Sequence, residues 1–584
     1  MTQQEIQWHK VAAIDELPEG RVKTVTAGRT SLALTHFNGR YGALDNHCPH
    51  QGGPLGEGSI EKGWLRCPWH GYDYNPLDGK PPPGFTDAPK HFDVEVRADG
   101  VYVALPPARP RARTVSDLMV DTMIAWGVTH VFGMVGHSNL GFADALRVAE
   151  ERGDLTFIGI RHEGAASFAA SAYAKLTGRL GACFAIAGPG STNLLTGLYD
   201  AQVDGASVLA LSGQVQSKVR GRGAFQDLDL SAVFADVAVS THTVLRDSDH
   251  VELMNLACKH ALAQRGVAHL ILPDEVQVLP APDDARAGGP TGRVGDRRLS
   301  PPDEPLHAAV QLIDGAKRPV IIVGHGAREG IDDVVQFAER LSAPILTTFK
   351  AKGIVPDDHP LACGVLGRSG TPVASWHMNE GDLLLVFGAS FANHTGIASY
   401  KPIVQIDNDP DGLGRFHPVT VPLLGDIGVV ARRLALDSSP ATIDQRRDVE
   451  ARKAIWNEEK MRRVHDDRGR GVASAAVFAA LTRHVPEDAV IAVDVGNNTY
   501  SFGRYFECKR GQHVLMSGYL GSIGFGFPAA MGAWAAAPDR PIIAVTGDGG
   551  FGQYLAELTT AVKYRMNITH VLLNNGQLGK ISKE

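Results

Sequence analysis

The stretch "GDGGFGQYLAELTTAVKYRMNITHVLLNN", residues 547–575, decides the fold of the C-terminal part of the chain because it reads as part of one strand–helix–strand unit. The strand-like run "IIAVTG" leads into Asp548, a helix-length segment follows, and the run "THVLLNN" ends at Asn575. A right-handed βαβ crossover can place the carboxyl ends of its two strands side by side. We therefore expect Asp548 and Asn575 to converge.

The residues at these two strand ends predict a metal site that binds a diphosphate. Side chains that offer only oxygen ligands suit Mg²⁺, which also binds diphosphate oxygens. Gly547, Gly549 and Gly550 allow backbone N–H groups to approach phosphate oxygens where the helix begins. The motif thus indicates Mg²⁺ held at Asp548 and Asn575.

The same alternation of strands and helices recurs upstream. Residues 155–213 read as strand, Ala-rich helix, strand, helix and strand, and strand-like runs recur at 319–436 and 489–575. Repetition of this kind favours parallel sheets with helices on both faces. Three α/β parallel-sheet domains are therefore expected.

The first part of the chain has a different pattern of apolar and turn-forming residues. Short runs such as "SLALTHF" (31–37) and "GVYVAL" (100–105) are broken by Gly, Pro and Asp, which predicts a small antiparallel β domain. The predicted fold class is a multidomain chain, with a small all-β domain before the three α/β domains.

Three segments rich in Pro, Gly or charged residues separate these parts, at 104–115, 281–305 and 444–470. The last segment is a run of charged residues, which predicts a solvated helix leading into a linker. The predicted domains are 1–106, 113–285, 305–436 and 470–584.

Two short loops in the front domain carry metal-ligand residues. "CPHQGGPL" (48–55) supplies Cys48 and His50, and sixteen residues later "CPWHGYD" (67–73) supplies Cys67 and His70. Two Cys and two His could bind a structural zinc ion. Each loop, however, supplies one ligand of each type, which is the arrangement for two loops that close on a binuclear cluster.

This front domain resembles Rieske ferredoxins over nearly its whole length, including "GKPPPGFTDAPKHFDVEV" (79–96). The resemblance implies a [2Fe–2S] cluster with Cys48 and Cys67 on one iron and His50 and His70 on the other. Neither loop has the additional Cys of high-potential Rieske proteins, which favours the lower-potential, electron-carrying kind. The α/β remainder does not suit the mononuclear iron domain of a Rieske oxygenase.

From about residue 113 onward the chain resembles the thiamine diphosphate enzymes of the acetolactate synthase and pyruvate oxidase family. The resemblance implies Mg²⁺ bound by Asp548, Asn575 and the main-chain carbonyl of Gln577. "SGYLGSIGFGFPAAMG" (517–532) matches the segment that holds the aminopyrimidine ring, with Ile523 as the apolar support for the bent cofactor.

By the same resemblance, Glu163 in "GIRHEGAASFAASAYAKLTG" (159–178) hydrogen-bonds the aminopyrimidine and assists deprotonation of the thiazolium carbon. This role needs a carboxyl group that can share a proton near neutral pH, which burial favours. Phe225 and Gln226, in "GAFQDLD" (223–229), match a pocket loop. The family builds this site across a subunit interface, which implies a homodimer or homotetramer.

The middle domain resembles the FAD-binding central domain of the same family in "RPVIIVGHGAREG" (318–330), "TTFKAKGIVPDDHPLACG" (347–364) and "VQIDNDP" (404–410). Gly324, Arg368, Asp407 and Asp426 lie where FAD contacts are expected. Some family members have an empty middle domain, and one short Gly motif is a weak signal. Both FAD-bound and FAD-free forms therefore stay open.

The two resemblances together predict oxidative decarboxylation of a pyruvate-like 2-oxo acid, with electrons passed to the Rieske cluster and on to a redox partner. One alternative is an acetolactate synthase-type carboligase whose cluster is structural or regulatory. Another is a non-catalytic, Rieske-tethered pseudoenzyme. It gains weight because the chain continues only nine residues beyond Asn575, so the last domain is expected to be truncated.

Composition limits the other possibilities. The formal net charge is −7 and the chain has no signal-like or membrane-length apolar stretch, so neither nucleic acid nor a membrane is an expected partner. Six Cys in 584 residues do not form a disulfide framework. These features favour a cytoplasmic protein.

Overall fold

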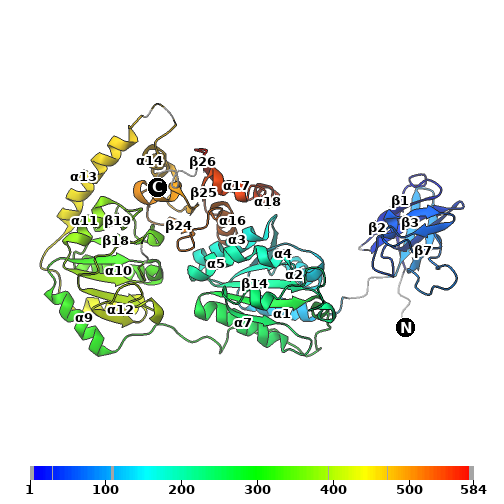
Figure 1. Ribbon diagram of the computed structural model, residues 1–584, viewed down its shortest axis with the longest axis horizontal. Helices are drawn as coiled ribbons and strands as arrows, with labels where there is room; N and C mark the ends of the chain where they lie inside the picture. The colour runs from blue at the N-terminus through cyan, green and yellow to red at the C-terminus, as the bar shows by residue number, and fades with distance from the viewer. Residues whose placement is uncertain are drawn as a thin grey trace. The chain divides into compact units, whose positions relative to one another are not determined.

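The structure is a computed structural model that describes residues 6–28, 30–106, 111–391, 394–467, 469 and 471–577. The chain divides into two compact units, Met1–Ala112 and Arg113–Glu584, each with its own apolar core (Figure 1). The last seven residues of the predicted domain 470–584 lie outside the described residues.

The first unit is built from antiparallel strands, as predicted. Its sheets have the orders β1-β10-β9, β2-β3-β4-β8 and β5-β6-β7. The strands are β1 (Gln7–Ala12), β2 (Arg21–Ala27), β3 (Thr30–Phe37), β4 (Arg40–Asp45), β5 (Ser59–Glu61), β6 (Trp64–Arg66), β7 (Asp73–Tyr74), β8 (His91–Phe92), β9 (Val94–Arg97) and β10 (Gly100–Leu105). Alternate side chains of β3 and β10, among them Leu34 and Val103, face one core, which fixes the register of these strands.

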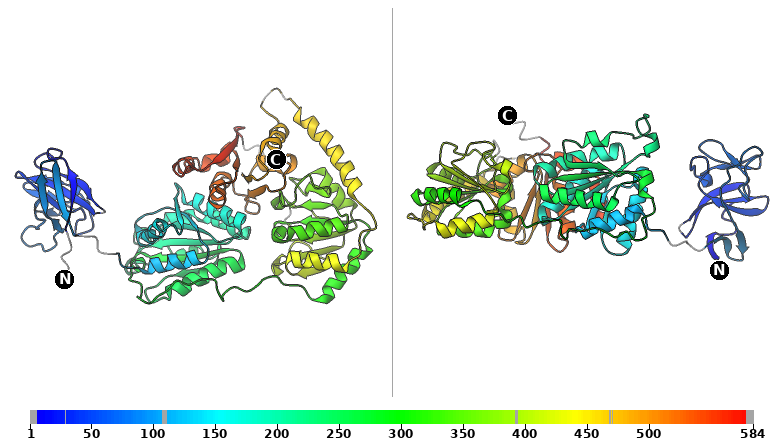
Figure 2. Two further views of the ribbon diagram at one scale, coloured as in Figure 1. Left: turned by 180° about the vertical axis from the view of Figure 1, so that it is seen from behind. Right: turned by 90° about the horizontal axis from the view of Figure 1, so that it is seen from below.

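The second unit begins with a parallel sheet of order β12-β11-β13-β14-β16-β15. Its strands are β11 (His130–Gly133), β12 (Thr156–Gly159), β13 (Gly181–Ala185), β14 (Val208–Gln214), β15 (Ala238–Thr243) and β16 (Val267–Pro273). Its helices are α1 (Val115–Ala125), α2 (Leu140–Glu151), α3 (Glu163–Thr177), α4 (Pro189–Asn193), α5 (Leu195–Val203), α6 (Leu230–Val233), α7 (His250–Gln264) and α8 (Asp274–Gln277). Val131 and Phe132 belong to different cores, so both faces of the sheet are covered by helices (Figures 1 and 2).

The second parallel sheet has the order β19-β18-β17-β20-β21-β22. Its strands are β17 (Pro319–Val323), β18 (Ile345–Thr347), β19 (Ala362–Val365), β20 (Leu383–Phe387), β21 (Ile403–Asp407) and β22 (Val421–Leu424). Its helices are α9 (Asp303–Gly315), α10 (Ile331–Arg340), α11 (Pro372–Glu380) and α12 (Ile427–Asp437). The predicted charged helix follows as α13 (Arg446–Val464).

The third parallel sheet has the order β24-β23-β25-β26 within the described residues. Its strands are β23 (Val490–Val493), β24 (His513–Met516), β25 (Ile542–Gly547) and β26 (Ile568–Leu573). Its helices are α14 (Ser474–His484), α15 (Asn497–Tyr505), α16 (Gly526–Ala536), α17 (Asp548–Gln553) and α18 (Glu557–Lys563). The predicted fold class, an all-β domain followed by parallel-sheet α/β domains, is confirmed. The domain boundaries stay a prediction.

The first and third sheets share one core through α3 and α16. The Ala-rich face of α3 packs so closely on α16 that a Cβ at Gly532 would overlap the carbonyl oxygen of Ala169. Helix α3 starts where the His162 side chain accepts a hydrogen bond from the Gly164 N–H, and it ends at Gly178 in the left-handed conformation. The helix that begins at Glu163 is thus fixed at both ends.

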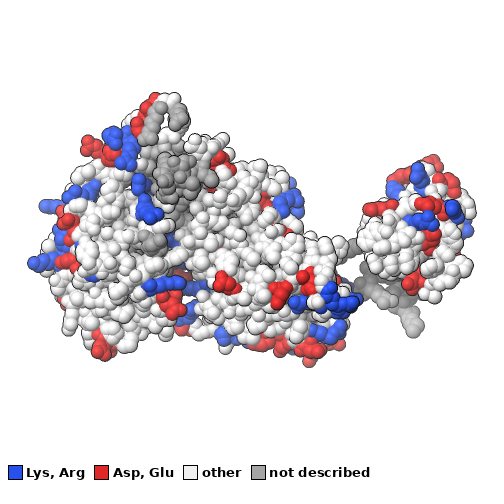
Figure 3. Space-filling model, viewed as in Figure 1, with Lys and Arg blue, Asp and Glu red and all other residues white. Residues whose placement is uncertain are grey.

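Positive and negative side chains are interspersed over the visible face of the molecule (Figure 3). This mixture gives no extended basic surface on that face of the described residues, which agrees with the net charge of −7. No helix within the described ranges is both long enough and apolar enough to span a bilayer.

Candidate cofactor sites

The two loops with the predicted metal ligands have the same backbone design. The N–H of Cys48 donates to the carbonyl of Gly53 at 2.8 Å, and the N–H of Gly52 donates back to the Cys48 carbonyl at 2.7 Å. In the second loop the N–H of Cys67 donates to the Tyr72 carbonyl, and the N–H of Gly71 donates to the Cys67 carbonyl. Both turns therefore present their Cys and His side chains alike.

The four side chains gather by type. Cys48 and Cys67 are buried in one apolar cluster of the front domain. The His50 and His70 rings lie 4.8 Å apart, edge to face. Nδ1 of His50 is buried and has no hydrogen-bond partner, as expected for a nitrogen reserved for a metal.

This arrangement fits a binuclear cluster and not a single zinc ion. Zinc would need four ligands around one point, but no three Cys, His, Asp or Glu side chains in the described part of the chain converge in that way. A sulfur pair beside an imidazole pair matches the ligands of a Rieske [2Fe–2S] centre. The Tyr74 hydroxyl lies 3.1 Å from Sγ of Cys48, where it can donate to a metal-bound thiolate.

The predicted Mg²⁺ residues come together at the carboxyl ends of β25 and β26. The two strands are parallel neighbours, with Gly547 paired to Leu573. The N–H of Asn575 donates to Oδ1 of Asp548 at 3.5 Å, and the N–H of Gln577 donates to Oδ1 of Asn575 at 3.1 Å. Their oxygen-donor chemistry fits Mg²⁺.

A third strand adds a residue that the sequence analysis missed. Asp494 directly follows β23, which neighbours β25, and its Oδ2 is buried with no hydrogen-bond partner. A Cβ at Gly550 would overlap this oxygen, and burial raises the pKa of Asp494 to about 6. A buried carboxyl group therefore packs under the expected diphosphate loop.

Glu163 is the first residue of α3 and is buried. Nδ2 of Asn193 donates to its Oε2 at 3.0 Å. The preceding turn is held by a second residue that the sequence analysis missed: Oε1 of buried Glu557 accepts from the N–H groups of Arg161 and His162, both at 2.9 Å. Within the described residues, no hydrogen bond joins Glu163 to Asp548.

The remaining pocket residues lie in loops. Gln226 has φ = +62° and packs against Gly188, whereas the adjacent Phe225 side chain is 86% exposed. Ile523 is half-buried, just before α16. The single chain therefore leaves one side of Phe225 open.

The four residues expected to contact FAD differ in burial and in the contacts that they already make. Gly324 follows β17, where a Cβ would overlap the Gly388 carbonyl, and buried Asp407 ends β21 near the same sheet edge. Burial raises the pKa of Asp407. Asp426 is the N-cap of α12, where it accepts from the Val429 N–H, and Arg368 is exposed.

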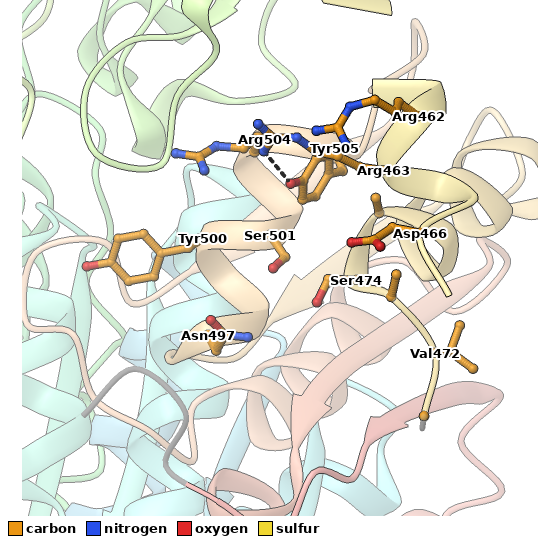
Figure 4. Close-up of a pocket in the computed structure, with 13 residues that line it drawn as sticks. Arg462, Arg463, Asp466, Val472, Ser474, Asn497, Tyr500, Ser501, Arg504 and Tyr505 are labelled. Atoms are coloured by element: carbon orange, nitrogen blue, oxygen red, sulfur yellow. Dashed lines mark hydrogen bonds between the residues drawn. The ribbon is translucent and has the colours of Figure 1, made fainter. Parts of the chain in front are cut away.

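A cavity of about 570 Å³ lies between the end of α13, the start of α14 and α15 (Figure 4). Its polar lining includes Arg462, Arg463, Ser474, Ser501, Arg504 and Tyr505. An Nη1 group of Arg463 donates to the Tyr505 hydroxyl at 3.1 Å. Asn497, three residues after Asp494, lines the same cavity, which is therefore a basic recess near the end of β23.

Four family models match the chain. Residues 7–84 match the Rieske [2Fe-2S] domain. Residues 113–233, 306–434 and 494–584 match the N-terminal TPP binding domain, the central domain and the C-terminal TPP binding domain of thiamine pyrophosphate enzymes, respectively. Thiamine pyrophosphate is another name for thiamine diphosphate.

The relatives that align with most of the chain include the following three. The Bacillus subtilis protein YdaP, whose name describes it as thiamine pyrophosphate-containing, is 38% identical over 479 residues, covering 81% of this chain and 82% of its own. The acetolactate synthase large subunit of Parasynechococcus marenigrum is 31% identical and covers 83% and 80%. The pyruvate oxidase of Lactiplantibacillus plantarum is 30% identical and covers 80% and 77%.

These matches and the two sites define a thiamine diphosphate-dependent enzyme. The chain belongs to the family that includes acetolactate synthase and pyruvate oxidase, and it carries a Rieske [2Fe–2S] domain at its N-terminal side. Both resemblances expected from the sequence are confirmed.

Proposed function

We propose that this protein oxidatively decarboxylates a small, pyruvate-like 2-oxo acid and passes the electrons to its own Rieske cluster. The observation that carries the proposal is the presence of both domains in one chain. For pyruvate, the substrate and one water give acetate, carbon dioxide, two protons and two electrons. Each cluster accepts one electron, so one turnover reduces two clusters.

Thiamine diphosphate, when bound, supplies the carbon nucleophile that makes loss of carbon dioxide feasible. The oxygen-donor set at Asp548, Asn575 and Gln577 supports Mg²⁺ as the ion that anchors the diphosphate. Gly547, Gly549 and Gly550 would allow their backbone N–H groups to approach the phosphate oxygens of the bound cofactor.

Glu163 is proposed to hold and release the proton at the aminopyrimidine ring. Its burial and its position at the start of α3 support this role. The hydrogen bond from Asn193 holds one carboxylate oxygen, which keeps the carboxyl group in a single orientation. Phe225 and Gln226 are proposed to face the substrate from the neighbouring loop.

The electron route is proposed to include FAD in the central domain, because a flavin can take two electrons and release them singly. Gly324 and Asp407 support this assignment through their place at the carboxyl edge of the central sheet. In the second ligand loop of the Rieske domain, His70 is exposed beside Trp69, which is itself 56% exposed. This exposure would give a redox partner access to the cluster.

A homodimer or homotetramer is proposed as the active form. Phe225 is exposed, and apolar Leu555, Leu558 and Val562 are exposed around α17 and α18. Apolar side chains gathered on a surface are typical of subunit interfaces. Sedimentation of the full chain that shows only monomers would contradict this assignment.

Product analysis tests the reaction against the carboligase alternative, which the similarity to acetolactate synthase favours. Purified protein with measured iron, sulfide, flavin and thiamine diphosphate is incubated with pyruvate. The proposal predicts acetate and carbon dioxide in equal amounts, with an electron acceptor reduced. A 2-hydroxy ketone as the main product, with no acceptor reduced, would favour the carboligase.

A further inference from the structure

A buried charge cluster lies where elements of all three parallel-sheet domains meet. It contains Lys175 of α3, Asp200 of α5, Asp204 directly after α5, and Lys350 of the short helix η5 (Phe349–Ala351). Nζ of Lys175 lies 2.6 Å from Asp200 Oδ2 and 2.7 Å from Asp204 Oδ2, and Nζ of Lys350 lies 2.8 Å from Asp204 Oδ1. Both carboxylate side chains are fully buried.

Two positive and two negative groups balance one another in this cluster. Charges removed from water are costly unless they are paired with good geometry, so each partner restricts the others to one arrangement. The cluster is therefore a rigid point in a region where loops of different domains meet.

One side of the cluster holds the segment Met516–Tyr519, which leads into the expected aminopyrimidine loop. Nζ of Lys175 donates to the Met516 carbonyl at 3.2 Å, and the N–H of Gly518 donates to Asp204 Oδ2 at 3.3 Å. A Cβ at Gly518 would overlap the stem of Lys350, so the segment lies directly against it.

A short chain of contacts leads from this segment to Ile523. The N–H of Ser522 donates to Oγ of Ser517 at 3.1 Å, which closes the loop between them. The Tyr519 and Ser390 hydroxyls lie 3.0 Å apart, which adds a contact to the central domain. Ile523 is the next residue after Ser522, so fixing Gly518 also fixes the approach to Ile523.

We propose that Asp204 is a positioning residue for thiamine diphosphate: it acts through Gly518 and holds the loop that places Ile523 against the cofactor. Asp200 provides the contrast, because it accepts hydrogen bonds from Ser171 and Lys175, both on α3. The inference rests on thiamine diphosphate binding by this family and not on the proposed electron route.

The matched variants Asp204→Asn and Asp200→Asn test this role in the full chain. Each removes one buried carboxylate charge next to Lys175, so both are expected to lower the melting temperature. Only Asp204 accepts a hydrogen bond directly from the loop, so Asp204→Asn weakens that bond, whereas Asp200→Asn leaves the contacts of Asp204 with Gly518 and Lys175 in place. We expect it to raise amide hydrogen exchange at 516–523 and the dissociation constant of thiamine diphosphate by about tenfold, as for loss of one charge-assisted hydrogen bond. Asp200→Asn stays within about twofold of wild type in both.

Gly518→Ala probes the same contact from the loop side and keeps the test informative if Asp204→Asn does not fold. It pushes the loop away from Lys350 and is expected to give the same two changes. Equal effects of the two Asp variants, or unchanged exchange at 516–523 in Gly518→Ala, would overturn the inference. Wild-type protein that binds thiamine diphosphate without reducing its cluster would refute the electron route alone.

Discussion

At Gly550 the structure leaves no space for a side chain, so a substitution there should displace the expected diphosphate loop. A methyl group there would overlap Oδ2 of Asp494, and it would lie 2.9 Å from Asp494 Cγ and 3.2 Å from the Gly524 nitrogen. Asp494 is buried, and the N–H of Val495 donates to its Oδ1 at 2.8 Å, so the carboxyl group has little room to move. The substitution Gly550→Ala must therefore move the loop.

The expected magnitude follows from the size of that movement. Relieving the overlap needs a displacement on the order of 1 Å, and a misplacement of this size in a catalytic site costs about 100-fold in rate. Overpacking also destabilises a fold by about 1–3 kcal/mol. We therefore expect Gly550→Ala to reduce kcat/KM and thiamine diphosphate affinity about 100-fold, which corresponds to about 2.7 kcal/mol.

Gly552→Ala is the matched control, because it lies in the same helix α17 and a Cβ there meets no atom within 4 Å. It should bind thiamine diphosphate like wild type in a titration followed by intrinsic fluorescence. The double variant Gly550→Ala/Asp494→Ala removes the overlapped carboxyl group and should regain at least about tenfold of the lost affinity. Equal affinity for Gly550→Ala and Gly552→Ala would refute this reasoning.

Three further outcomes are expected. Tyr74→Phe removes the hydroxyl beside Sγ of Cys48, which would stabilise the reduced cluster more than the oxidised one. Loss of about 1.4 kcal/mol of this preference should lower the one-electron potential of the cluster by about 59 mV in protein-film voltammetry. An unchanged potential would contradict the contact. Burial raises the pKa of Asp494 to about 6, so the folded protein holds this proton more tightly than the unfolded chain, and stability should fall as pH rises from about 4 to about 6. Urea unfolding of Asp494→Asn should lack this part of the pH dependence, and an identical pH profile would contradict it. Glu163→Gln should lower kcat at least about 100-fold while substrate still binds, as measured by stopped-flow kinetics; near-normal kcat would exclude the proton-transfer role.

The sequence predicted those parts of the sites that depend on local chain geometry. Asp548 and Asn575 end strands that a βαβ crossover makes neighbours, and the structure places them at adjacent ends of β25 and β26. The spacing of Cys48, His50, Cys67 and His70 likewise predicted two paired loops. In each case the distance along the chain fixes where the side chains lie.

Contacts between distant segments could not be predicted in this way. Glu557 is fully buried under the turn before Glu163, almost 400 residues away in sequence, and nothing in its local composition indicates that contact. The same holds for the bond between Asp204 and Gly518. Asp494 follows a strand like Asp548 and could have been found, because the order of parallel strands places both at one sheet edge.

Anaerobic single turnover with pyruvate tests the central claim most directly, namely that this chain supplies electrons to its own cluster. The oxidised full-length protein is mixed with substrate in the absence of other acceptors, and the cluster is followed by its optical and electron paramagnetic resonance spectra. The account predicts that the clusters become reduced as carbon dioxide is released, two for each substrate molecule. Carbon dioxide release with the clusters still oxidised would contradict it.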